Sequence, residues 1–123
     1  MGEALADWHH AQHEHNSSFA AHTDRAVYPD WVITGCFYAA LHLVQQALID
    51  EFGTGPRKHE ERNLWVFKCT RTKGVAQAYL DLKALSEHVR YNVAHTDVGD
   101  DQVSEAADLL AEIESGLGLA VSQ

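Results

Sequence analysis

The chain has 123 residues, of which 46% are hydrophobic and 22% are charged, and this length and balance are typical of a single folded domain covering residues 1–123. Its net charge of −9 argues against a protein that binds nucleic acid over its whole surface. The start of the chain lacks the basic and apolar regions of a signal peptide, and both cysteines lie in apolar stretches, so a reduced, cytoplasmic protein is expected. No stretch alternates apolar and polar residues as a strand would, which predicts an all-α fold.

The first predicted helix covers about residues 3–24 and has a narrow apolar stripe along one side. The members of this stripe are Leu5, Trp8, Gln12, His15 and Phe19. On the same helix, His9 and His13 lie one turn apart, which is the spacing that two ligands of one metal ion would use. Because no cysteine is close and surface histidines are common on amphipathic helices, an exposed or interface face is the favoured interpretation. No metal site and no cofactor are therefore predicted.

The second predicted helix, Pro29–Phe52, is apolar on nearly every face, which predicts a central helix covered by the others. Its proline suits the first helical turn, and Gly53 suits the left-handed residue that follows a helix. The 19 residues 31–49 carry no formal charge, so a bilayer span is the alternative. Polar side chains within the helix, and the lack of a Lys or Arg cluster beside it, argue against a membrane protein. His42 on this helix is interpreted as a hydrogen-bonded core or interface residue.

Three further helices are predicted after a loop at residues 53–58. The first is short, covers about residues 59–70, and directs Leu64, Trp65 and Phe67 toward the core. The next begins near residue 74, and its inward positions are Val75, Ala78, Tyr79, Leu82, Leu85, Val89 and Val93. The last follows a break at residues 92–101, and its inward positions are Val103, Ala106, Ala107, Leu110, Ile113 and Leu117. Either Asp100 or Asp101 is expected to cap it. Four long helices and one short helix predict an antiparallel helical bundle.

The charged residues are distributed unevenly along the chain. Six of the nine Lys and Arg residues fall between residues 57 and 73, whereas acidic residues dominate after residue 90. Within the basic segment, Arg57, Lys58, His59 and Arg62 are candidates to guide a phosphate backbone. The alternative is that these residues only balance the acidic last helix.

Arg90 and His95 are the candidates for chemistry. On a helical wheel, Arg90 lies about 90° from the centre of the apolar stripe, at the edge of the core. It shares this side of the helix with Tyr79, Lys83 and Ser86. In an unbroken helix, Arg90 and His95 would point about 140° apart, so they can act together only if the helix bends or ends near Asn92. The alternative is a surface ion pair between Arg90 and Glu87 or Asp97, with His95 solvated.

The chain resembles the HEPN superfamily (higher eukaryote and prokaryote nucleotide-binding domains) in three features. These are the second helix with the sequence FYAALHLVQQALI, the basic segment containing a histidine, and the later Arg-x4-His pair. The likeness covers about residues 8–117, and the second helix is its most specific part. In members that cut RNA, an arginine and a histidine separated by a short spacer meet across a two-fold dimer. The resemblance implies that Arg90 and His95 occupy these positions in a homodimer. The chain departs from the family at Tyr91, where Asn, Asp or His is common, and Asn92 one place later becomes a candidate substrate-binding residue.

The resemblance implies a metal-independent endoribonuclease. His95 would act as general base on a ribose 2′-OH or as acid toward the leaving 5′-oxygen, and Arg90 would hold the phosphate. The product would be a 2′,3′-cyclic phosphate, and the biological role would be that of a toxin or defence protein with an antitoxin as partner. Because many HEPN domains are not nucleases, the alternative is a non-catalytic module that binds a nucleotide, a phosphate or a partner protein.

Overall fold

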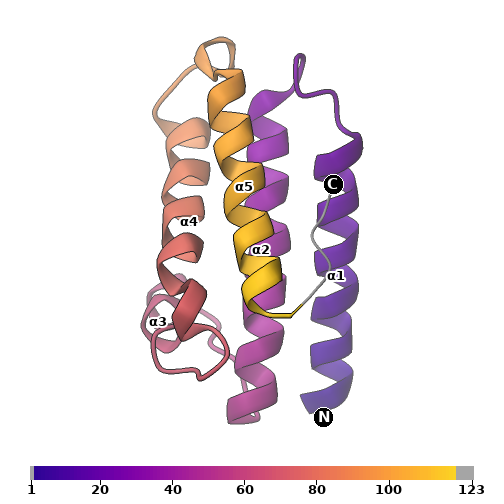
Figure 1. The fold of residues 1–123 in the computed structure, drawn as a ribbon, viewed down its shortest axis with the longest axis vertical. Coiled ribbons are helices and arrows are strands. Elements are labelled where there is room, and N and C mark those ends of the chain that lie inside the picture. The colour runs from indigo at the N-terminus through magenta and orange to yellow at the C-terminus, as the bar shows by residue number, and fades with distance from the viewer. Residues whose placement is uncertain (1, 119–123) are drawn as a thin grey trace.

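The computed structural model describes the backbone of residues 2–118 and the side chains of residues 7–118, and within them the chain forms an antiparallel bundle of α-helices (Figure 1). The long helices are α1 (Gly2–His22), α2 (Pro29–Phe52), α4 (Ala76–Tyr91) and α5 (Asp100–Gly116). The short elements are α3 (His59–Trp65) and the single 3-10 turns η1 (Lys73–Val75) and η2 (His95–Asp97). No strand occurs in the described part of the chain. The predicted all-α bundle of four long helices and one short helix is therefore confirmed.

Helix α2 forms the centre of the bundle, since α1, α4 and α5 all pack against it. It begins at Pro29, as predicted, and ends at Gly53, whose φ of 77° lets its N–H donate back to the Ile49 carbonyl at 2.8 Å. The helix is long and apolar enough to cross a membrane, but 83% of its most apolar 18-residue window is buried inside the bundle. Most of its apolar surface is thus already covered by the other helices, with Trp31 and Phe52 left exposed.

Helix α1 turns a different face inward from the one predicted. Trp8 and Phe19 are 52% and 44% exposed, so the described part of the expected stripe faces outward, and the side chain of Leu5 lies outside the described residues. The inward positions are instead occupied by small and polar residues, namely His13, Ser17 and Ala20, with the half-buried His9 beside them. The prediction failed because hydrophobicity was taken as the guide to burial. In α1, small side chains let the helix approach its neighbours closely, and polar side chains pair across the contact.

The segment from α3 to η1 also differs from the prediction. Leu64 is 64% exposed and Phe67 is exposed, although both were expected in the core, while Trp65 is half-buried against the core. Helix α3 ends at Trp65, and the turns that follow direct Val66 and Cys69 inward until both are completely buried. The helical period used for the prediction therefore stops applying after the first two turns.

Helices α4 and α5 follow their predicted patterns closely. Tyr79 and Leu82 on α4 and Ile113 on α5 are fully buried. Ala107, which was expected inside, is exposed. The start of α5 is closed by Gly99, whose N–H donates to the side-chain oxygen of Gln102 at 3.0 Å, and the expected aspartate cap is not used.

Candidate functional site

The end of α4 places Arg90 at the edge of the core. The helix stops at Tyr91, so the change of direction that joint action of Arg90 and His95 requires is present. The Arg90 Nε atom donates to the Ser86 carbonyl at 3.2 Å, and Nη1 donates to the hydroxyl of Tyr38 on α2 at 3.3 Å. Its guanidinium carbon lies 5.8 Å and 5.1 Å from the ring centroids of Tyr38 and Tyr91, within range of a cation–π attraction. The guanidinium is therefore held in a defined place between α4 and α2.

Arg90 makes no ion pair with any other side chain of residues 7–118. Glu87, one of its expected partners, instead pairs with Lys83 one turn earlier. The hydrogen bond from Lys83 lowers the pKa of the Glu87 carboxyl, and the charges of Lys83 and Arg90 act in the same direction. The expectation of a surface ion pair for Arg90 is thus wrong, and its charge stays available to an anion.

A cavity of about 260 Å³ lies beside Arg90. It is lined by Asp30, Trp31, Thr34 and Arg90. Trp31 is 56% exposed at its rim, so an aromatic face stands next to the cation. A nucleobase or a second protein chain could stack there while an anionic group meets Arg90.

His59 at the start of α3 belongs to the same electrostatic neighbourhood. Burial lowers the pKa of its imidazole, and the charges of Arg62, Lys83 and Arg90 lower it further, while Glu87 opposes them. Arg62 Nη1 lies 3.2 Å from His59 Nδ1 and can only donate, so the neutral ring carries its hydrogen on Nε2. His59 is thus a neutral hydrogen-bond donor close to the three cations Arg62, Lys83 and Arg90.

The other predicted binding residues are placed differently from one another. Arg62 is only 6% exposed, and its guanidinium donates to Gln45 Oε1 at 2.8 Å and to the Pro56 carbonyl at 3.3 Å. Because these contacts are internal, Arg62 holds the loop before α3 against α2 and is not available at the surface. Arg57 and Lys58 are exposed in that loop, and the exposed Asn92 closes α4 through its N–H to the His88 carbonyl.

His95 is exposed on η2, after the turn that follows α4. No hydrogen bond or ion pair among the described side chains joins it to Arg90. Within the described chain, His95 does not line the cavity beside Arg90, and no polar contact joins the two residues. Sequence reasoning missed Tyr38, which lies on a different helix 52 positions away, whereas the helical wheel had already placed Lys83 on the Arg90 side.

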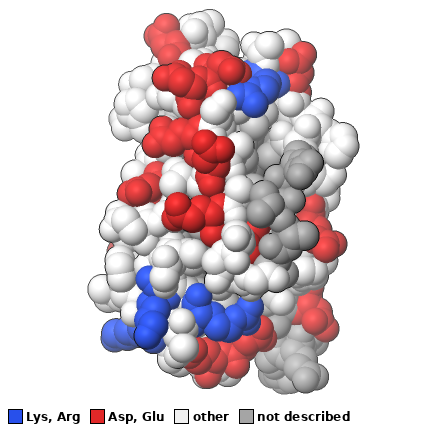
Figure 2. Space-filling view, viewed as in Figure 1, with Lys and Arg blue, Asp and Glu red and all other residues white. Residues whose placement is uncertain are grey.

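The surface charges are separated, as the sequence predicted. Figure 2 shows acidic residues along α5 and basic residues gathered at the end of the molecule that holds α3 and η1. An anion that approaches this face meets repulsion over α5 and attraction at the α3 end.

The histidines of α1 divide between the exposed and the interface positions that the sequence favoured: His15 and His22 are exposed, whereas His9 and His13 lie at contacts with other helices. His9 Nδ1 lies 2.6 Å from Nδ1 of His42 on α2, and the buried His13 donates from Nε2 to the fully buried Glu114 of α5 at 2.8 Å. This confirms His42 as a hydrogen-bonded histidine at a helix contact. No group of three or more His, Cys, Asp or Glu residues within the described region is arranged to hold a metal ion.

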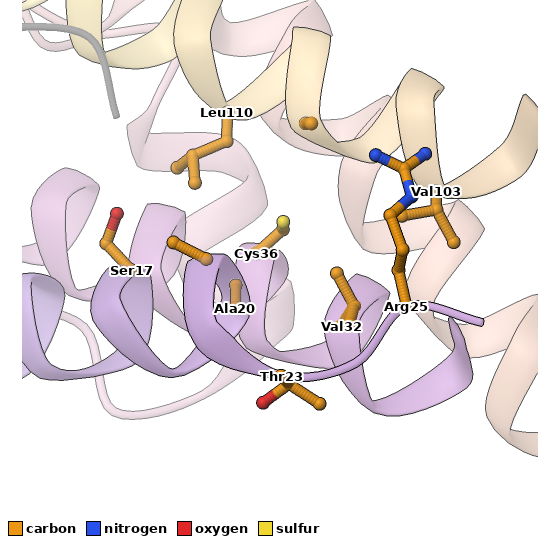
Figure 3. Close-up of a pocket in the computed structure, with 10 residues that line it drawn as sticks. Ser17, Ala20, Thr23, Arg25, Val32, Cys36, Val103 and Leu110 are labelled. Atoms are coloured by element: carbon orange, nitrogen blue, oxygen red, sulfur yellow. The ribbon is translucent and has the colours of Figure 1, made fainter. Parts of the chain in front are cut away.

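A second cavity, of about 180 Å³, lies between α1, α2 and α5 (Figure 3). Its walls are mostly small or apolar, with Cys36 and Leu110 among them. Arg25 at its rim is engaged by Asp100 and Ser104 of α5 at 2.7 Å and 2.9 Å. The cavity contains none of the predicted site residues, so the candidate site remains the region around Arg90.

Comparison with known proteins adds no family assignment: no protein-family model matches the sequence, and neither the curated proteins nor the solved structures contain a match.

Proposed function

We propose that the chain is a cytoplasmic HEPN-like domain that binds an RNA phosphate at Arg90 and cleaves the RNA as a homodimer, with His95 as its acid–base group and without a metal ion. The observation that carries this proposal is the Arg90 guanidinium. It is held by Tyr38 and Ser86, makes no ion pair within the described residues, and borders a cavity. A fixed cation of this kind can bind a phosphate oxygen without reorganising.

The neighbouring residues support phosphate binding. Lys83, although it pairs with Glu87, adds a second positive charge, and the Nε2–H of His59 adds a neutral donor. Arg57 and Lys58 extend the positive charge along the loop before α3 and could guide the rest of the RNA backbone. The exposed Trp31 offers a stacking surface for a base.

The cleavage step needs one base and one acid. A neutral His95 would take the proton of the ribose 2′-OH, and the 2′-oxygen would attack the phosphorus. The bond to the 5′-oxygen would break, and this oxygen would receive a proton from water. Arg90 would stabilise the charge on the phosphoryl oxygens, and the products would be a 2′,3′-cyclic phosphate and a 5′-hydroxyl.

A homodimer is part of the proposal because His95 of the same chain does not line the cavity beside Arg90. Next to the Arg90 cavity, Phe19, Tyr28 and Trp31 line an apolar hollow of about 480 Å³. Trp31 borders both, so the apolar surface is continuous with the candidate site. In a two-fold dimer this surface would meet its own copy and bring Arg90 of one chain toward His95 of the other.

The test is cleavage of total RNA in the presence of EDTA. Wild-type protein should produce fragments with cyclic phosphate ends, whereas Arg90→Ala and His95→Ala should lose cleavage. Arg25→Ala is the matched control, because Arg25 is an exposed arginine engaged with α5 and is not one of the proposed site residues. Absence of cleavage by the wild-type protein, or equal cleavage by all four proteins, would rule out the nuclease.

The alternative is a non-catalytic HEPN-like module that binds a nucleotide or a partner protein such as an antitoxin. Tyr91 favours it, since this 74% exposed aromatic ring covers Arg90 at a position where the resemblance would place a polar residue. A thermal-shift screen with nucleotides distinguishes the two functions. A ligand at 100 times its dissociation constant adds about 2.7 kcal/mol of stability, and this gain should disappear in Arg90→Ala.

A further inference from the structure

Two histidines from different helices share one hydrogen bond where α1 crosses α2. The Nδ1 atoms of His9 and His42 are 2.6 Å apart, and their rings are stacked with centroids 4.9 Å apart. Trp8 packs its ring edge-on against both, at centroid distances of 4.7 Å and 5.4 Å. Since an imidazole nitrogen donates only when it carries a hydrogen, one Nδ1 must be protonated and the other must be bare.

Among the described side chains, α1 contributes little fully buried apolar surface: Phe19 lies against Gly35 of α2 but is still 44% exposed. Among the described side chains of α1, Ala20 alone belongs to the buried apolar core. One turn beyond His9, His13 contacts Glu114 of α5 at 2.8 Å, and this second polar contact is buried. Since burying the methyl group of an alanine stabilises much less than burying a leucine, the polar contacts carry an unusual share of the attachment.

We infer that the His9 and His42 pair is a proton-sensitive latch, which holds α1 on α2 while at least one Nδ1 atom is bare and releases α1 when both rings are protonated. This inference does not depend on RNA binding at Arg90.

The number of protons decides the state of the latch. A neutral pair forms one N–H···N bond, and a pair with one extra proton can form the same bond between an imidazolium and an imidazole. A second extra proton places two N–H groups and two positive charges face to face at 2.6 Å, so the bond is replaced by repulsion.

The surroundings oppose the second proton. Burial, the charge of His9, and the charges of Arg62 of α3 and His13 of α1 together lower the pKa of His42 to about 4. Burial and Arg62 also lower the pKa of His9. The other buried histidine of α1, His13, faces the acidic side chain of Glu114, whereas the His9 and His42 rings face each other, so the response is assigned to the His9 and His42 pair.

Release of α1 should leave the remaining helices together. Except for Ala20, the described core lies in α2, the segment from Val66 to Val75, α4 and α5 together with Val98 just before it. Their mutual packing involves neither His9 nor His42. We therefore expect a local transition in which α1 loses its helical packing before the whole protein unfolds.

The test is a pH titration followed by backbone amide NMR. In the wild-type protein, the amide signals of residues 9–22 should move to random-coil positions between about pH 6.5 and pH 4, while those of Leu82 and Ile113 stay dispersed. In His42→Gln, which keeps a hydrogen-bonding side chain but cannot gain a charge, the transition should move at least about one pH unit lower.

His15→Gln is the matched control, because His15 is an exposed histidine on the same helix, and it should leave the transition where it is in the wild type. The inference is overturned if α1 signals persist unchanged to pH 4 in the wild type, if they disappear together with those of Leu82 and Ile113, or if His42→Gln and His15→Gln behave alike. Should His42→Gln fail to fold at pH 7, His9→Gln supplies the same comparison.

Discussion

Replacing Arg62 by lysine should destabilise the protein by about 3 kcal/mol, although the charge is kept. The guanidinium donates to Gln45 and Pro56 and contacts His59, at distances of 2.8 to 3.3 Å. A lysine ammonium cannot reach these three acceptors at once. Hydrogen bonds from a charged group contribute about 1.5 to 3 kcal/mol each, and the Pro56 carbonyl would keep its bond from the Gln45 amide at 2.8 Å, which limits the loss.

Urea unfolding followed by circular dichroism measures this change, and the midpoint should fall while the m value stays constant. Arg57→Lys is the matched control, since the same substitution at an exposed arginine in the same loop should change the free energy of unfolding by less than about 0.5 kcal/mol. If Arg62→Lys were as stable as Arg57→Lys, Arg62 would not be the internal tie between the loop and α2, and its assignment to phosphate binding would be restored.

Three further predictions concern separate parts of the molecule. Tyr38→Phe removes the hydroxyl that positions Arg90. The affinity for RNA or a nucleotide, measured by fluorescence anisotropy, should fall by about 2-fold to 10-fold with little loss of stability. An unchanged affinity would contradict this role of Tyr38. Val66→Ala should lower the free energy of unfolding by about 2 kcal/mol because Val66 is completely buried, whereas Leu64→Ala should lower it by less than about 0.5 kcal/mol. If urea unfolding showed Leu64→Ala to be the less stable variant, the described end of α3 would be refuted. The pKa of His42 is lowered from 6.5 to about 4 in the folded state, so the unfolded chain binds more protons and the free energy of unfolding should fall as the pH drops from 6.5 toward 4. After allowance for partial solvent exposure, His42→Gln should reduce this fall by about 1 to 2 kcal/mol. Identical pH slopes for the two proteins would argue against this prediction.

The parts of the fold that were predictable are those where hydrophobic pattern and burial coincide. Helix α2 was located to the residue, because a proline, a continuous apolar run and a glycine mark its start, its body and its end. The inward positions of α4, such as Tyr79 and Leu82, were correct for the same reason. The end of α4 at Tyr91 was also expected, from the small and polar residues that follow.

Helix α1 could not be oriented from its sequence because its contact is made by polar pairing. His9 needs His42, and His13 needs Glu114 from the other end of the chain. Nothing in the local pattern indicates such distant partners. Trp8 and Phe19, the residues that the pattern favoured, remain on the surface, where the proposed dimer would use part of them.

The candidate site was predictable in its residues but not in its contacts. Arg90 was identified, yet the Tyr38 hydroxyl that holds it comes from α2, and a helical wheel of α4 cannot show it. For the same reason Arg62 was assigned to the surface, since its acceptors Gln45 and Pro56 become visible only when the loop is folded back on α2.

The most direct test of the proposed site is complementation between two inactive variants. If Arg90 of one chain acts with His95 of the other, a mixture of Arg90→Ala and His95→Ala, allowed to exchange subunits, contains mixed dimers with one intact site each. RNA cleavage in EDTA should then return to about a quarter of the wild-type rate, although each variant alone is inactive. A mixture that exchanges subunits but stays inactive would contradict the shared site.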